Sequence, residues 1–65
     1  MNRNKTRVDV EVLEVNGDEP AAEGMVVSVR NHWNRDCLVI LCLPNKTNLT
    51  VFADDLANAI RKCST

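Results

Sequence analysis

Seven consecutive apolar residues, at positions 37–43, occupy the middle of a chain of 65 residues. A short apolar run without polar alternation is typical of a central strand that is covered on both faces. A domain of about 60 residues buries only about 60% of the surface that its unfolded chain exposes, so it has little material with which to cover two faces. We therefore expect one domain, residues 1–65, that is stabilised by a second copy of itself.

Apolar and polar residues alternate on either side of this run with the two-residue period of half-buried strands. Four strands are predicted, at residues 7–15, 25–30, 37–43 and 49–53. The phase of the alternation changes near Val12, which predicts a bulge in the first strand. Asn16-Gly17 is a strong turn signal and opens an acidic segment, 16–24, that we expect to be a mobile loop. Residues 1–6 are expected to form a flexible N-terminal arm.

Apolar residues near the end of the chain change to helical spacing. Leu56, Ile60 and Cys63 fall at i, i+4 and i+7, with acidic residues before them and Arg61-Lys62 near the end, as suits the helix dipole. The predicted fold class is α+β: a small antiparallel four-stranded sheet with one C-terminal helix on one face, in the order ββββα. In such a sheet we expect Leu38, Ile40 and Cys42 to form the interface between copies.

The cysteine and histidine content argues against a disulfide framework, a metal site and a cofactor. The three cysteines are an odd number with no secretory signal before them, there is no C-x-x-C pair, and His32 is the only imidazole. His32, Asp36 and Cys37 lie close in sequence, but a thiol that begins an apolar strand is usually a buried small hydrophobe rather than a nucleophile. We expect a protein that is not an enzyme.

The charge balance limits the classes of partner. Eight Lys and Arg residues against nine Asp and Glu residues give a formal net charge of −1, which argues against a general nucleic-acid binder. The longest apolar run is far shorter than the roughly 20 residues that a membrane span requires, and a signal peptide is not recognisable. The chain is therefore expected to work in the cytoplasm.

The best candidate ligand site is the loop between the second and third predicted strands, where the only Trp and the only His lie between two Arg residues. Its members are Arg30, Asn31, His32, Trp33, Asn34 and Arg35. Arg and aromatic side chains together can hold an anion, stack on a base or anchor a protein partner. The alternative is that Trp33 folds back over the edge of the core while the Asn residues make turn hydrogen bonds.

Two motifs in this half of the chain resemble those of a known group of proteins. The stretch VRNHWNRDCLVILCL, followed by LTVFADDLANAIR, is similar to small uncharacterised proteins encoded by bacteriophages and prophages, which carry H-W-N before an apolar strand and a C-terminal D-L-x-x-A-I helix. The resemblance covers residues 29–61 and implies a setting rather than an activity: an accessory or anti-defence protein in the host cytoplasm.

Two functions follow from these observations. The first is a homo-oligomeric binding module that sequesters a small anionic, nucleotide-like signal with the loop at residues 30–35. The alternative is a protein-binding inhibitor that covers a host enzyme through Trp33 or a sheet edge.

Overall fold

Four antiparallel strands form one sheet in the computed structural model, which describes residues 6–64. The elements are β1 (Arg7–Glu11), β2 (Glu14–Val15), β3 (Glu19–Pro20), β4 (Val26–Asn31), β5 (Leu38–Cys42), β6 (Asn48–Phe52) and α1 (Ala53–Cys63). The predicted α+β class, a four-stranded antiparallel sheet with one C-terminal helix, is confirmed. Apart from Thr6, the predicted N-terminal arm lies outside the described residues.

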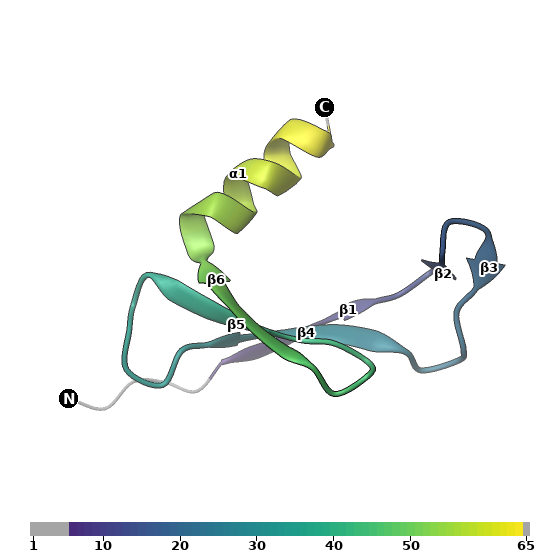
Figure 1. Cartoon of the computed structure of the whole chain (residues 1–65), viewed down its shortest axis with the longest axis horizontal. Helices are drawn as coiled ribbons and strands as arrows, with labels where there is room; N and C mark the ends of the chain where they lie inside the picture. The colour runs from purple at the N-terminus through teal and green to yellow at the C-terminus, as the bar shows by residue number, and fades with distance from the viewer. Residues whose placement is uncertain (1–5, 65) are drawn as a thin grey trace.

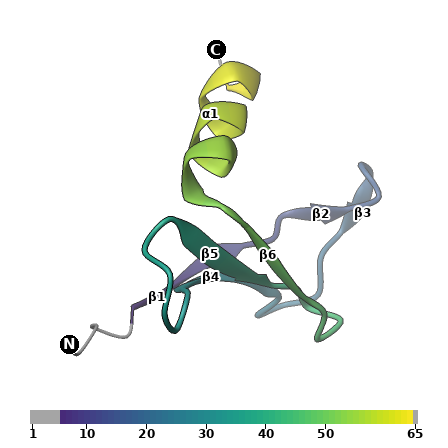
Figure 2. The same cartoon turned by 60° about the vertical axis from the view of Figure 1, so that its left-hand side comes forward.

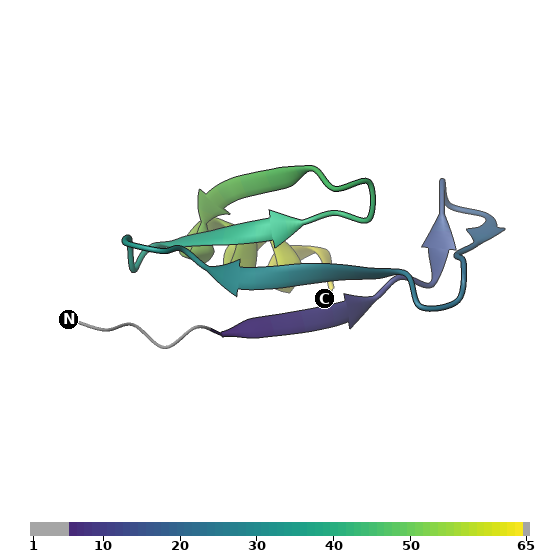
Figure 3. The same ribbon diagram turned by 90° about the horizontal axis from the view of Figure 1, so that it is seen from below.

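The strand order of the sheet is β1-β4-β5-β6, as the view from below shows (Figure 3). The apolar run therefore lies inside the sheet, where β5 pairs with β4 on one side and with β6 on the other. The prediction of a central strand is confirmed, because an interior strand satisfies its backbone on both edges and can be apolar throughout.

The first predicted strand is shorter than the alternation suggested. β1 ends at Glu11, which is paired with Val26 at the start of β4, and the change of phase near Val12 is a break between two strands rather than a bulge. The chain continues into β2, which pairs with β3 across the Asn16-Gly17 turn to make a two-stranded ribbon at one end of the sheet (Figure 1). Asn16 and Gly17 both have positive φ, 57° and 88°, as tight hairpin turns require.

Register sorts the strand residues into two faces, because cross-strand partners in an antiparallel sheet point to the same side. One face, named here the apolar face, carries Val8, Val10, Val27, Val29, Val39, Leu41, Leu49 and Val51, with Asn31 at one end. The opposite face, named the mixed face, carries Arg7, Asp9, Glu11, Val26, Ser28, Arg30, Leu38, Ile40, Cys42, Asn48, Thr50 and Phe52. Apart from Asn31, the sheet is thus apolar toward one side and partly polar toward the other.

Helix α1 stands away from the sheet instead of lying on it (Figure 2). It begins at Ala53, directly after β6, and its main contact is with that strand. Leu56 in its first half is partly covered, whereas Ile60 is 59% exposed. Among the described residues no apolar side chain is buried, and the buried side chain is that of Ser28. The predicted helix is present, but it does not cover the face that its apolar stripe was expected to cover.

The hairpin between β5 and β6 contains a residue whose backbone suits glycine better than the side chain it has. Lys46 has φ of 70°, its N–H donates to the carbonyl of Leu43, and the Leu43 N–H donates to the carbonyl of Thr47. A side chain in the left-handed region costs roughly 1–2 kcal/mol, which glycine avoids.

Lys46→Gly should therefore raise the free energy of unfolding by about 0.5–1 kcal/mol, because relief of the left-handed conformation exceeds the entropy that glycine adds to the unfolded chain. Urea unfolding at a fixed protein concentration measures the change. Lys46→Ala is the matched control, since it removes the side chain beyond Cβ but keeps the left-handed cost. A Gly variant no more stable than the Ala variant contradicts the prediction.

Candidate ligand-binding site

Two arginines from neighbouring strands meet at one end of the mixed face. Arg30 on β4 is paired in register with Arg7 on β1, so the two side chains leave the sheet on the same side. Together with Thr6 and Asn31 they line a surface hollow of about 300 Å³. Like charges directly opposite each other on a sheet repel, and an anion held between them would remove that cost.

Asp9 neutralises part of this charge. Its Oδ1 accepts hydrogen bonds from the Arg7 Nε at 2.9 Å and from the buried Ser28 hydroxyl at 2.8 Å. The Ser28 hydrogen bond, followed by the hydrogen bond and the charge of Arg7, lowers the pKa of Asp9, and partial desolvation opposes them. Asp9 thus holds the Arg7 guanidinium toward the middle of the strand.

Backbone and side-chain hydrogen bonds fix the edge of the hollow. The Asn31 Oδ1 accepts from the Thr6 N–H at 3.0 Å, and the Asn31 N–H donates to the Thr6 carbonyl at 3.3 Å. These bonds extend the pairing of β1 and β4 past Arg7. They place the end of β4, and with it the following loop, at a defined distance from β1.

The aromatic pair predicted to belong to the site forms a stack in that loop. The rings of His32 and Trp33 have centroids 5.4 Å apart and planes 26° apart, and the His32 Nδ1 accepts a hydrogen bond from the Asn34 N–H at 3.2 Å. Trp33 is 77% exposed. The indole therefore points to solvent, and the alternative in which it covers the edge of the core is wrong.

The remaining predicted residues are placed as follows. Asn34 and Arg35 are exposed in the loop, and Asp36 and Cys37 follow them, also exposed, before β5 begins. Between residues 6 and 64, no group of three or more His, Cys, Asp or Glu residues is arranged to hold a metal ion. The sequence prediction missed Arg7, whose position beside Arg30 depends on the register of β1 against β4 and not on any local pattern.

The predicted interface residues lie on the mixed face of β5. Leu38, Ile40 and Cys42 are half-buried, and their cross-strand neighbours include Arg30 and Thr50. This surface is distinct from the apolar face, on which β5 presents Val39 and Leu41.

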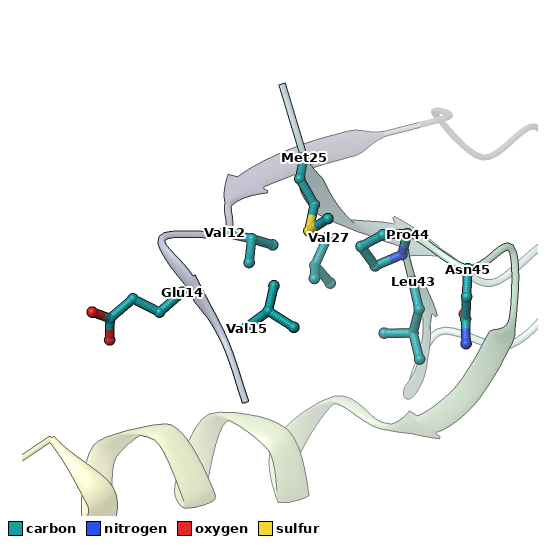
Figure 4. A pocket seen from close by; sticks show the side chains of 8 residues that line it. All are labelled: Val12, Glu14, Val15, Met25, Val27, Leu43, Pro44 and Asn45. Carbon is teal, nitrogen blue, oxygen red and sulfur yellow. The ribbon is translucent and has the colours of Figure 1, made fainter. Parts of the chain in front are cut away.

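A second, apolar pocket lies near the β2–β3 ribbon and was not predicted. It has a volume of about 370 Å³ and is lined by Val12, Glu14, Val15, Met25, Val27, Leu43, Pro44 and Asn45 (Figure 4). Val27 and Leu43 point to the side of the sheet on which α1 stands. The pocket is lined by three segments that are far apart in the sequence. The change of phase near Val12 was the only feature of the sequence analysis that pointed to this region.

Comparisons with known proteins yield no relatives: the chain matches no protein-family description, no curated protein and no solved structure at a significant level. Within residues 6–64, no helix is long and apolar enough to cross a membrane.

Ser28→Ala should raise the pKa of Asp9 toward the ordinary carboxylate range, because it deletes the largest of the interactions that lower it. A lowered pKa in the folded state contributes stability above the ordinary Asp range, and that contribution disappears as the pH falls through the folded-state pKa. The variant should therefore lose less stability on acidification than the native chain does, because the difference between the folded-state and unfolded-state pKa of Asp9 is smaller. Carboxyl ¹³C NMR titration measures the pKa directly.

The control is the same substitution in an Asp9→Asn background, where the acid-dependent difference between chains with and without the Ser28 hydroxyl should vanish. If the difference persists without the Asp9 carboxylate, its source is another group, and the assignment to the Ser28–Asp9 hydrogen bond is wrong.

Proposed function

We propose that this protein is a small non-enzymatic binding module that acts as a homo-oligomer and sequesters a small anionic, nucleotide-like ligand. The observation that carries the proposal is the pairing of Arg7 with Arg30 at the end of the mixed face, close in the chain to the stacked rings of His32 and Trp33, of which the indole is exposed. A nucleotide has the two matching parts, a phosphate and a flat base.

The phosphate is assigned to the arginines. Guanidinium groups form charge-assisted, often bidentate hydrogen bonds with phosphate oxygens, and such bonds are about twice as strong as neutral ones. Arg30 is exposed and borders the hollow shared with Arg7. A bound phosphate would also relieve the repulsion between the two cross-strand cations.

The base is assigned to Trp33. An exposed indole offers a flat apolar surface, and stacking of one base on an aromatic side chain contributes roughly 1–3 kcal/mol. The contact of Trp33 with the His32 ring reduces its freedom before a ligand arrives, so less entropy is lost on binding. A homo-oligomer would present several such loops in one particle.

The resemblance of residues 29–61 to small bacteriophage and prophage proteins supplies the setting. In the host cytoplasm, a protein that removes a nucleotide signal acts stoichiometrically and needs no catalytic group. An accessory, anti-defence role fits a binding module of this size.

One observation favours a second candidate, a protein-binding inhibitor of a host enzyme. Trp33 and Phe52 are large apolar side chains that are 77% and 54% exposed. Exposed aromatic residues are common anchors of protein interfaces. Phe52 is the last residue of β6, which is an edge strand of the sheet and could pair with a partner's strand.

Isothermal titration calorimetry of the native protein against linear and cyclic nucleotides tests the first candidate. We expect one member of the panel to bind, Arg30→Ala to weaken it at least about 10-fold through the lost charge-assisted bonds, and Trp33→Ala to weaken it roughly 5- to 150-fold through lost stacking. Quenching of the single Trp gives an independent signal. Lys46→Ala, which removes a positive charge far along the chain, is the control and should bind as the native protein does.

Absence of binding to every nucleotide in the panel contradicts the sequestration proposal. Recovery of a bacterial protein that depends on Trp33, in the same preparation, would support the inhibitor instead.

A further inference from the structure

The described residues, 6–64, leave the apolar face of the sheet largely uncovered within one copy of the chain. Its edge-strand members Val8 and Val10 are 57% and 53% exposed, and even Val39 and Leu41 on the interior strand are only half-buried. Monomeric soluble proteins rarely expose a continuous apolar surface of this kind, and such surfaces mark interaction sites.

The accessible surface of the chain is larger than that of a compact monomer of the same mass. The chain exposes 5661 Å², whereas a compact monomer of 7.3 kDa exposes about 4,200 Å². The excess is about 1,500 Å² per chain, against about 800 Å² per partner in a standard interface. If two copies each buried that excess, the total of about 3,000 Å² would lie in the range of obligate homodimers, about 2,000–5,000 Å².

The chain's own helix is held away from this face by its attachment. α1 follows β6 without a linker, since the residue before it, Phe52, is still extended with φ −69° and ψ 131°. The Ala53 N–H donates to the carbonyl of Cys37 at 2.9 Å, which ties the first helical residue to the start of β5. The helix therefore begins where the pairing of β5 with β6 ends, with no linker on which it could fold back over its own sheet.

The helix itself presents a surface that fits an apolar sheet. Leu56, Ile60 and Cys63 form one stripe along it, whereas Asp55 and Asn58 lie on the other side. The stripe is left largely open, because Ile60 and Cys63 are both exposed. The chain thus carries both halves of a helix-on-sheet core and does not join them within one copy.

The apolar pocket offers a place for the end of such a helix. It lies at the ribbon end of the sheet, away from the base of α1, and opens on the same side (Figures 1 and 4). Glu14 borders this otherwise mostly apolar pocket, and its charge is opposite to that of Arg61 in the last turn of the helix.

We propose that the occupant of the apolar face is a second copy of this chain, bound so that each copy's α1 lies across the apolar face of the other and inserts Ile60 into its pocket. A two-fold axis makes the exchange reciprocal, and it builds two identical helix-on-sheet cores. The inference deepens the proposed function, on whose homo-oligomer it rests, but it uses none of the ligand-site residues.

The first test is the solution mass by light scattering. The native protein should have twice 7.3 kDa, and both Ile60→Glu, in the helix stripe, and Leu41→Glu, on the apolar face, should reduce it to 7.3 kDa. Asn58→Glu places the same charge on the other side of the helix and should remain dimeric. Ile40→Glu places it on the mixed face beside Leu41 and should also remain dimeric.

A native monomer, or dissociation by Ile40→Glu but not by Leu41→Glu, overturns the proposal. The second outcome would place the interface on Leu38, Ile40 and Cys42 of the mixed face instead.

The second test needs no substitution, so unfolding of a variant cannot obscure it. In a mixture of isotope-labelled and unlabelled native chains, filtered NMR spectra should show intermolecular contacts between the Ile60 methyl groups and those of Val27 or Leu43. Contacts found only within one chain, or contacts between helix and helix, overturn the reciprocal exchange.

Calorimetry separates the two proposals. A dimer with these contacts that binds no nucleotide leaves the helix exchange standing and removes the proposed ligand. If the native protein is a monomer that binds a nucleotide, the proposed ligand stands and the helix exchange is wrong.

Discussion

The junction between β6 and α1 has no linker, and the hydrogen bond from the Ala53 N–H to the Cys37 carbonyl continues the pairing of β5 and β6 up to the first residue of the helix. From this junction α1 leaves the sheet without covering the strands that precede it (Figure 2). Since a domain of this size depends on every apolar surface that it can bury, a helix held away leaves the sheet without a core of its own. Within the described residues of one chain, the apolar side chains are at most half-buried.

The two faces of the sheet divide the properties of the molecule between them. The apolar face exposes apolar surface, and the hydrophobic effect favours the burial of such surface. The mixed face offers directed charge at one end, where Ser28 and Arg7 hold the Asp9 carboxylate and Arg30 borders an open hollow. The proposed ligand site and the proposed assembly surface lie on different faces, so neither would obstruct the other.

Much of the fold followed from local pattern. The central strand, the Asn16-Gly17 turn, the β5–β6 hairpin and the helix all depend on periodicity or turn chemistry over a few residues, and all are present. The predicted bulge near Val12 was wrong, because the alternation cannot show that the pairing of β1 with β4 stops at Glu11, opposite the first residue of β4. The exposure of Trp33 could not be predicted either, since the same loop sequence is compatible with an indole that packs on the sheet and with one that points to solvent.

The sequence by itself determined which segments form strands, which form turns and which forms the helix, because side-chain period and turn geometry are properties of neighbouring residues. It also determined that the central strand would be apolar on both sides. Only the tertiary structure decided that Arg7 lies beside Arg30, that Val39 and Leu41 share the apolar face while Ile40 lies beside Arg30 and Thr50 on the other, and that α1 stands away from the sheet. The reason is that register and junction geometry are non-local: a slip of one residue between strands exchanges the faces.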